Sequence, residues 1–135
     1  MFFGEYPVRF SYQKRRLALP AKIRQEIKGD EVVFARGFEK CILGYAREEW
    51  EKSARQQIEI PITEEKGRKI RRYLFSGAMA NSFDRQGRVV IPPMLVDYAQ
   101  LNEEEVVIIG AGDHFEIWNK KQWQQYLKDL KKENL

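Results

Sequence analysis

The amino-acid sequence predicts a mainly β protein with short helices, an α+β fold built from two copies of one unit around a pseudo-twofold axis. The first observation behind this prediction is internal repetition, because SYQKRRLALPA at residues 11–21 is a blurred copy of SFDRQGRVVIPP at residues 82–93. The flanks repeat as well, since MFFG resembles LFSG and EVVFARG resembles EVVIIGAG. The second observation is that short strand-like and helix-like segments alternate in each copy, with a repeat spacing near 72 to 73 residues.

The first copy begins with two predicted strands that form a hairpin. Apolar residues alternate with polar or small ones from Tyr6 to Phe10, the pattern of a half-buried strand, and a second short strand follows at residues 17–19. Pro20 then begins a predicted helix that places Ile23 and Ile27 on one face and ends near residue 29. The segment EVVFARGFEKCILGY predicts two further strands around residue 37.

The second copy repeats this order with a strand at residues 89–91, a short helix after residue 93, and two strands within EVVIIGAGDHFEIW. Each copy closes with an amphipathic helix. The first spans residues 48–57 and carries Trp50, and the second follows Asn119, a predicted N-cap, and carries Trp123. We expect Trp50, Trp118 and Trp123 to anchor a core or an interface, and Cys41 to be a small buried apolar residue.

About four short strands per copy are too few to bury both sides of a sheet, so we expect the two halves to exchange or share strands. The predicted organisation is a first repeat with its closing helix at residues 1–57, a connecting segment and helix at 58–73, and a second repeat with its closing helix at 74–135.

Charge and composition narrow the function. The formal net charge is only +4, but residues 1–30 hold seven Lys or Arg against three Asp or Glu, and residues 64–90 again hold seven against three. Both surpluses include a copy of the repeated turn, which favours a polyanionic partner such as nucleic acid. One cysteine and one histidine, Cys41 and His114, give no expected disulfide, metal site or cofactor. The absence of any apolar run of about 18 residues, and of an apolar signal region, predicts a cytoplasmic protein with no membrane partner.

The turn DRQGR has a clear physical reading. Asp84 can accept backbone N–H bonds within a tight turn, and Gly87 can adopt the positive φ that other residues avoid. Arg85 and Arg88 would then project from a rigid hairpin end, where guanidinium groups can bridge phosphates or contact guanine edges. The alternative is that Asp84 and Arg88 merely pair with each other.

The segment from Asp84 to Pro92 resembles the D-x-K/Q-G-R-x-x-x-P signature of the MraZ and AbrB-like regulators. The opening MFFGEY, both turns, PAKIR, the GAGDHFEIW block and both tryptophan-bearing helices resemble the two-repeat MraZ pattern specifically. The resemblance implies two AbrB-like repeats that form a swapped-hairpin β-barrel and assemble further into rings. It also implies a nucleoid-associated homo-oligomer that binds double-stranded DNA and regulates the bacterial division and cell-wall genes.

The first turn departs from that signature. It has six residues, SYQKRR, where the second has five, it lacks the glycine, and Ser11 stands where the family has aspartate. We expect the longer loop to reverse the chain without a residue at positive φ, and to present more charge with less order. The resemblance carries a DNA-contact role to Arg16, Arg85 and Arg88, with Lys14 and Arg15 as phosphate contacts and Gln86 as a weaker polar candidate; Asp84 and Gly87 shape the turn.

Two other classes of function compete with DNA-binding regulation. AbrB-type domains also serve as antitoxins, which bind a partner protein and their own promoter, although such proteins commonly join a disordered tail to one barrel repeat. An enzyme is disfavoured, since the chain has no G-x-S-x-G, no glycine-rich phosphate loop and no recognisable carboxylate pair, so no small-molecule substrate is expected.

Overall fold

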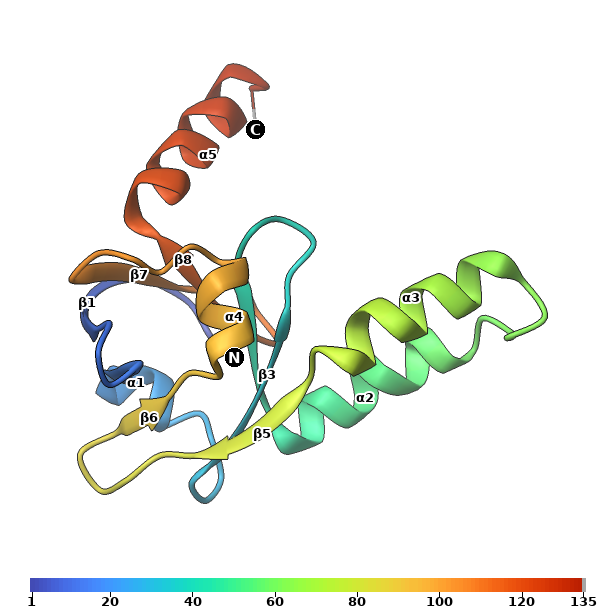
Figure 1. Cartoon of the computed structure of the whole chain (residues 1–135), viewed down its shortest axis with the longest axis horizontal. Helices are drawn as coiled ribbons and strands as arrows, with labels where there is room; N and C mark the ends of the chain where they lie inside the picture. Colours follow the sequence, from blue (N-terminus) through green and yellow to red (C-terminus); the bar gives the residue numbers. More distant parts are fainter. Residues whose placement is uncertain (135) are drawn as a thin grey trace.

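The computed structural model describes residues 1–134 and shows eight strands in one sheet, in the order β5-β3-β4-β8-β7-β1-β2-β6 (Figure 1). The strands are β1 (Glu5–Ser11), β2 (Arg16–Ala18), β3 (Glu31–Arg36), β4 (Ile42–Ala46), β5 (Met79–Ser82), β6 (Arg88–Val90), β7 (Glu105–Gly110) and β8 (Phe115–Asn119). The helices are α1 (Ala21–Arg24), α2 (Arg47–Ile58), α3 (Glu65–Ser76), α4 (Pro93–Tyr98) and α5 (Lys120–Lys132). The side-chain amide of Asn81 donates to Val90 O at 3.3 Å across the outermost strands, β5 and β6, so the sheet curls into a nearly closed barrel.

The two halves of the chain exchange strands, which confirms the expectation from the repeat. Strand β1 pairs with β7, β2 with β6, β3 with β5 and β4 with β8, and all four pairs are antiparallel. Under this pairing, the four strands of the first half correspond in order to the four strands of the second half: β1 to β5, β2 to β6, β3 to β7 and β4 to β8. A pseudo-twofold axis requires this correspondence. The prediction of a mainly β, two-repeat, pseudo-twofold barrel is therefore confirmed.

Aromatic and branched aliphatic side chains fill the barrel. Phe10, Phe34 and Phe115 are each at most 2% exposed, and Ile108 and Ile117 are fully buried among them. Burying a side chain of this size stabilises the fold by about 1.5–3 kcal/mol relative to leaving it exposed. Because inward residues come from both halves, neither half has a complete core of its own.

A second apolar cluster lies outside the barrel, beneath the long helices. Figure 1 shows α2 and α3 side by side as a helical hairpin that projects from the barrel, and α5 projecting separately. Trp50 of α2 packs on Tyr45, while Trp123 of α5 packs on Trp118, with ring centroids 5.5 and 5.3 Å apart. The three tryptophans are thus packing anchors, as predicted. Cys41 is buried in the same cluster, also as predicted.

An ionic network lies at the edge of this outer cluster. His114 contacts Asp113 through Nδ1 at 2.7 Å and Glu116 through Nε2 at 2.9 Å, and Trp118 Nε1 donates to the other oxygen of Glu116. Burial alone would lower the pKa of His114, but its hydrogen bonds to the two carboxylates outweigh burial and raise it. Burial alone would raise the pKa of Glu116, but its hydrogen bonds with His114 and Trp118 outweigh burial and lower it. Each partner therefore favours the charged form of the other.

The helices begin largely where the sequence predicts. Asn119 Oδ1 accepts from Gln122 N at 3.1 Å, which confirms the N-cap of α5. The helix expected to end near residue 29 is wrong in its length, because α1 ends at Arg24 and the chain continues in tighter turns, with Ile27 N donating to Arg24 O. These turns still bury both Ile23 and Ile27. No helix in residues 1–134 is long and apolar enough to cross a bilayer.

Candidate nucleic-acid interface

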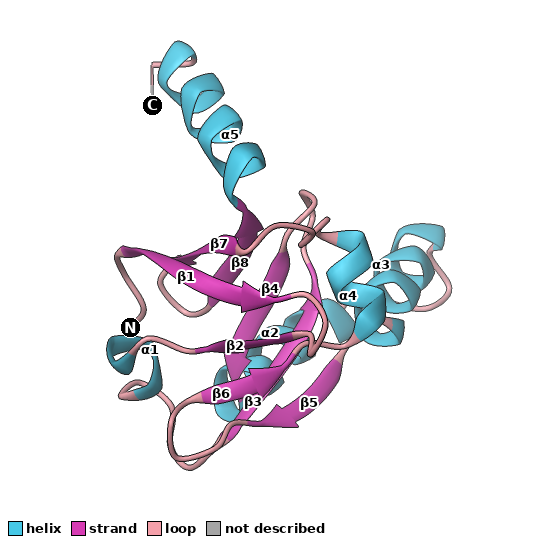
Figure 2. Ribbon diagram, turned by 60° about the vertical axis from the view of Figure 1, so that its left-hand side comes forward, coloured by secondary structure: helices cyan, strands magenta, loops and turns pink. Residues whose placement is uncertain are grey.

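The candidate interface is a short two-stranded ribbon formed by β2 and β6, with one turn at each end. Register pairs Arg16 with Val90, Leu17 with Val89 and Ala18 with Arg88. The strands are antiparallel and each turn immediately precedes its strand, so turn 1 (residues 12–15) and turn 2 (residues 84–87) lie at opposite ends of the ribbon. Figure 2 shows β2 and β6 side by side on one side of the barrel.

The buried residues of the ribbon identify which of its side chains face outward. Leu17 and Val89 are 2% and 1% exposed and point into the barrel. Side chains alternate along a strand, so Arg16 and Ala18 of β2 face outward with Arg88 and Val90 of β6. The six predicted contact residues all lie in the turns or at the first position of these two strands: Lys14, Arg15, Arg16, Arg85, Gln86 and Arg88. All six are exposed except Arg16, which is half-buried.

Turn 2 is shaped as predicted. Asp84 Oδ1 accepts backbone N–H bonds from Gln86 at 2.9 Å and from Arg88 at 3.0 Å. Gly87 N donates to Asp84 O, and Gly87 has φ +78. The bond from the Arg88 backbone, followed by contacts with the Arg88 side chain and Gln86 N, holds the pKa of Asp84 below its usual range. The carboxylate is therefore charged at neutral pH and fixes the turn.

Arg88 also pairs with Asp84, through Nε and Oδ2 at 2.8 Å. This pairing does not occupy the whole guanidinium group. Within residues 1–134 neither Nη atom of Arg88 has a hydrogen-bond partner, so the pair orients the group and leaves its outer edge available. Pairing with Asp84 and contact with an external ligand are thus compatible.

Arg24 supports turn 2 and was missed by sequence reasoning. Its Nε donates to Leu19 O at 3.0 Å and its Nη1 reaches Arg85 O at 3.5 Å. A Cβ added to Gly87 would lie 2.6 Å from Arg24 Cδ, so the side chain lies directly against the glycine. Arg24 belongs to the first repeat and turn 2 to the second, and this contact follows from strand exchange. The sequence signal is weak: a cation in the helix after Pro20, where the second repeat has Val96.

Turn 1 contradicts the expectation that its longer loop avoids positive φ, because Arg15 has φ +50. The reason is the pairing between halves. Ile91 N donates to Arg15 O at 2.7 Å, and Leu19 N donates to Gly87 O at 2.8 Å, which makes Arg15 the backbone equivalent of Gly87. In the ribbon, the carbonyl groups of Arg15 and Gly87 each accept a hydrogen bond from the opposite strand. Turn 1 adopts this backbone geometry without a glycine.

The expectation that Ser11 occupies the place of the aspartate in turn 1 is also wrong. Arg15 N donates to Tyr12 O just as Gly87 N donates to Asp84 O, so Tyr12 has the backbone place of Asp84. Ser11 is the additional residue and lies at the end of β1. Its Oγ accepts from Lys14 N at 3.3 Å, a single bond where Asp84 makes several. No carboxylate of turn 1 therefore clamps Arg16.

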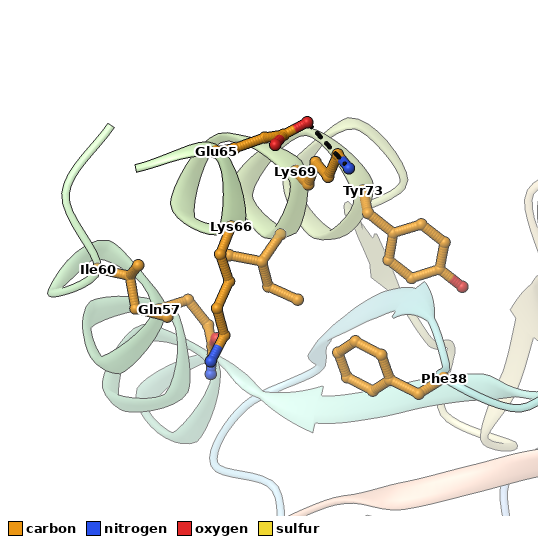
Figure 3. A pocket seen from close by; sticks show the side chains of 8 residues that line it. Phe38, Gln57, Ile60, Glu65, Lys66, Lys69 and Tyr73 are labelled. Carbon is orange, nitrogen blue, oxygen red and sulfur yellow. Dashed lines mark ion pairs between the residues drawn. The ribbon is translucent and has the colours of Figure 1, made fainter. Parts of the chain in front are cut away.

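A groove of about 700 Å³ lies away from both turns, between the α2–α3 hairpin and Phe38 (Figure 3). Figure 3 shows Phe38 and Tyr73 on one side and Lys66 and Gln57 on another. Phe38 stacks on Tyr73 with centroids 5.8 Å apart, and the one acidic lining residue, Glu65, pairs with Lys69 at 3.1 Å. The lining contains no histidine or cysteine, and its remaining polar residues are Lys66, Gln57 and Tyr73.

Comparison with known proteins places the chain beside one family. Residues 1–73 and 74–135 each match the family described as "MraZ protein, putative antitoxin-like". Transcriptional regulator MraZ of Roseiflexus castenholzii is 45% identical over 130 residues, which cover 96% of this chain and 89% of that protein. Transcriptional regulator MraZ of Lactobacillus johnsonii is 42% identical, with 96% and 88% covered, and that of Halothermothrix orenii is 42% identical, with 94% and 87% covered.

Proposed function

This chain belongs to the MraZ family, and on that premise we propose that it is a transcriptional regulator that binds double-stranded DNA in a sequence-specific way. Its relatives carry the name transcriptional regulator. The observation that carries the proposal is the exposed ribbon with a cationic turn at each end. From the family resemblance, the proposed setting is the cytoplasmic nucleoid, and the proposed targets are the division and cell-wall genes.

The ribbon has suitable dimensions for the major groove, which admits a two-stranded β-ribbon. Arg16 and Arg88 project from its outer face at opposite ends. The two arginines are diagonal neighbours across β2 and β6, about 7–8 Å apart, which is close to the rise of two base pairs. We propose that these two arginines contact base edges and that Lys14, Arg15 and Arg85 contact phosphates. Gln86 is exposed in turn 2 and is a further polar contact.

The proposed active form is a ring-like homo-oligomer on repeated short sites. Two surfaces support assembly: the groove beside Phe38, whose side chain is 62% exposed, and the part of α5 beyond the barrel, where Leu127 and Leu130 are half-exposed. One ribbon can read only a few base pairs, so a single protomer has little specificity. Several protomers on spaced repeats gain affinity through a high effective concentration.

The alternative is an antitoxin-like module, which the words "antitoxin-like" in the family description favour. Such a protein would bind its own promoter and a partner protein. Here α5 is a helix anchored by Trp123 on Trp118, rather than an unstructured appendage to one barrel repeat. This anchored second repeat supports the regulator over the antitoxin.

The proposal is tested by selecting bound DNA from a random pool with the full chain, and then measuring affinity against salt and the size of the complex. With roughly three to five phosphate contacts per protomer, log K should fall with log salt at about −0.9 per contact, a slope of about −3 to −4.5. Flat affinity across salt, or a monomer that binds single and repeated sites equally, would contradict the proposal. A stoichiometric partner protein that displaces DNA would support the antitoxin alternative.

A second experiment separates the roles of the two turns. Arg88→Ala should lose discrimination between selected and random DNA by about 1–3 kcal/mol, as expected for a lost base contact. Arg15→Gly, which keeps the positive φ, should weaken binding to both DNAs alike and reduce the salt slope by about one. Arg72→Ala is the matched control, because Arg72 is exposed on α3, outside both turns. Equal losses for Arg88→Ala on both DNAs would show that Arg88 binds only phosphate.

A further inference from the structure

The outer face of the ribbon has chemically different ends. At the turn 1 end, Val90 lies opposite Arg16 and is 49% exposed, and Met94 at the start of α4 is 45% exposed. At the turn 2 end, the equivalent positions are Ala18 and Lys22, both exposed. Val90 and Met94, four residues apart in the second repeat, are thus exposed apolar residues where the first repeat has an alanine and a lysine.

Val90 lies beside a cationic segment. Lys14 and Arg15 precede Arg16, and within residues 1–134 none of these three cations forms an ion pair. Cross-strand partners have Cβ atoms about 5 Å apart, so Val90 and Arg16 form one surface. The aliphatic side chain of Val90 beside these unpaired cations could bind a polyanion that also carries apolar groups.

The area of the patch argues against a second protein chain as its occupant. The exposed halves of two side chains of this size amount to on the order of 100 Å², whereas a stable protein interface buries about 800 Å² on each partner. The three cations of this segment, Lys14, Arg15 and Arg16, also favour an anionic ligand. The charge instead complements DNA, whose major groove displays the C5-methyl group of thymine as its apolar feature.

We propose that Val90 and Met94 form a reading surface for the thymine methyl group, beside the base contact of Arg16. The inference rests on the proposed function, because the ribbon must first enter the major groove. It adds a specificity element to the turn 1 end: the arginine reads a hydrogen-bond edge, and the valine and methionine read the apolar group of a neighbouring base pair. The turn 2 end presents only the methyl group of Ala18 and the cation of Lys22, a smaller apolar surface.

The test replaces each thymine of the selected DNA, one at a time, by deoxyuridine, which keeps the hydrogen-bonding edge and lacks the methyl group. For the unmodified protein, one or two of these replacements should weaken binding about fourfold, the equivalent of burying one methyl group. Val90→Ala and Met94→Ala should each weaken binding to the thymine DNA and lose most of the preference for thymine at those positions. Ile62→Ala, at an exposed isoleucine between α2 and α3, is the matched control and should keep the full preference.

Val90→Thr guards against a folding artefact, since threonine has the same shape and similar strand preference and keeps one γ-methyl group; it should retain more of the preference for thymine than Val90→Ala does. The inference is overturned if the selected DNA has no fixed thymine, if no replacement matters, or if Val90→Ala and Met94→Ala keep full discrimination. It is also overturned if these variants change the oligomer size while the thymine preference persists, because a second copy would then cover the patch. Salt-dependent binding to selected DNA without any methyl effect would overturn this inference alone, whereas absence of such binding would overturn the proposed function as well.

Discussion

Replacement of Gly87 by alanine should destabilise the protein by about 2–3 kcal/mol, for two separable reasons. Gly87 has φ +78, and the left-handed conformation costs a residue with a Cβ about 1–2 kcal/mol. The new Cβ would also lie 2.6 Å from both Cδ and Nε of Arg24. Arg24 would then have to move and give up its bond to Leu19 O, which contributes about 1 kcal/mol for a half-buried charged donor.

The matched variant is Arg15→Gly, at the equivalent backbone position in turn 1. Here glycine relieves a left-handed conformation at φ +50, a gain of about 1–2 kcal/mol. The greater freedom of glycine in the unfolded chain offsets about 0.5–1 kcal/mol of this gain. Arg15→Gly should therefore be as stable as the unmodified protein or up to about 1.5 kcal/mol more stable.

Urea unfolding at one fixed protein concentration measures both variants, because assembly would otherwise shift the apparent stability. The midpoint should fall for Gly87→Ala with an unchanged m-value. In the double variant Gly87→Ala/Arg24→Ala the steric conflict is absent, so its loss should be about 1 kcal/mol smaller than the sum of the two single losses. A Gly87→Ala protein within about 0.5 kcal/mol of the parent, or an Arg15→Gly protein less stable by more than about 1 kcal/mol, would refute the equivalence of the two turns.

Two further predictions concern the outer cluster. The raised pKa of His114 means that its ionic bonds stabilise the fold fully below about pH 6.5 and that this contribution is lost as pH rises through the raised value. The lowered pKa of Glu116 means that its contribution is present above about pH 4.5 and lost as pH falls through the lowered value. Urea midpoints measured against pH should therefore fall as the pH rises above about 6.5 and through the raised pKa of His114, and His114→Gln should flatten that fall; an unchanged profile would contradict the pairing. Burial raises the pKa of the Cys41 thiol, so a thiol reagent at neutral pH should label it only across the unfolding transition, and rapid labelling of the native protein would contradict its burial.

The sequence was sufficient to predict the repeated architecture, for a physical reason. Alternation from Tyr6 to Phe10 marks strands with one buried face, and four short strands cannot enclose a core alone, so exchange between the halves follows from burial. The second turn was predictable because its signals are local: Asp84 and Gly87 act on backbone groups within four residues of themselves.

Two features of the candidate site, the contact of Arg24 with turn 2 and the positive φ of Arg15, could not be predicted because they depend on contacts between the two halves. Arg24 contacts turn 2 only because β2 and β6 are neighbours, and nothing local in PAKIR indicates a contact with the Arg85 carbonyl 61 residues away. The same holds for Arg15. Local preference argues against positive φ for an arginine, yet the bond from Ile91 N fixes its carbonyl group from the opposite strand.

This dependence changes the comparison between the two turns. A six-residue loop without glycine is expected to be less ordered than DRQGR, but the ribbon holds Arg15 O and Gly87 O by equivalent backbone bonds. The remaining difference lies in the side chains. Arg88 is oriented by Asp84 at 2.8 Å, whereas the equivalent place in turn 1 belongs to Tyr12, which cannot pair with Arg16. The ribbon therefore places Arg16 and Arg88 alike, while the turn sequences determine how far each side chain is oriented in the free protein. If both arginines contact DNA, Arg88 should lose little side-chain freedom on binding and Arg16 should lose more.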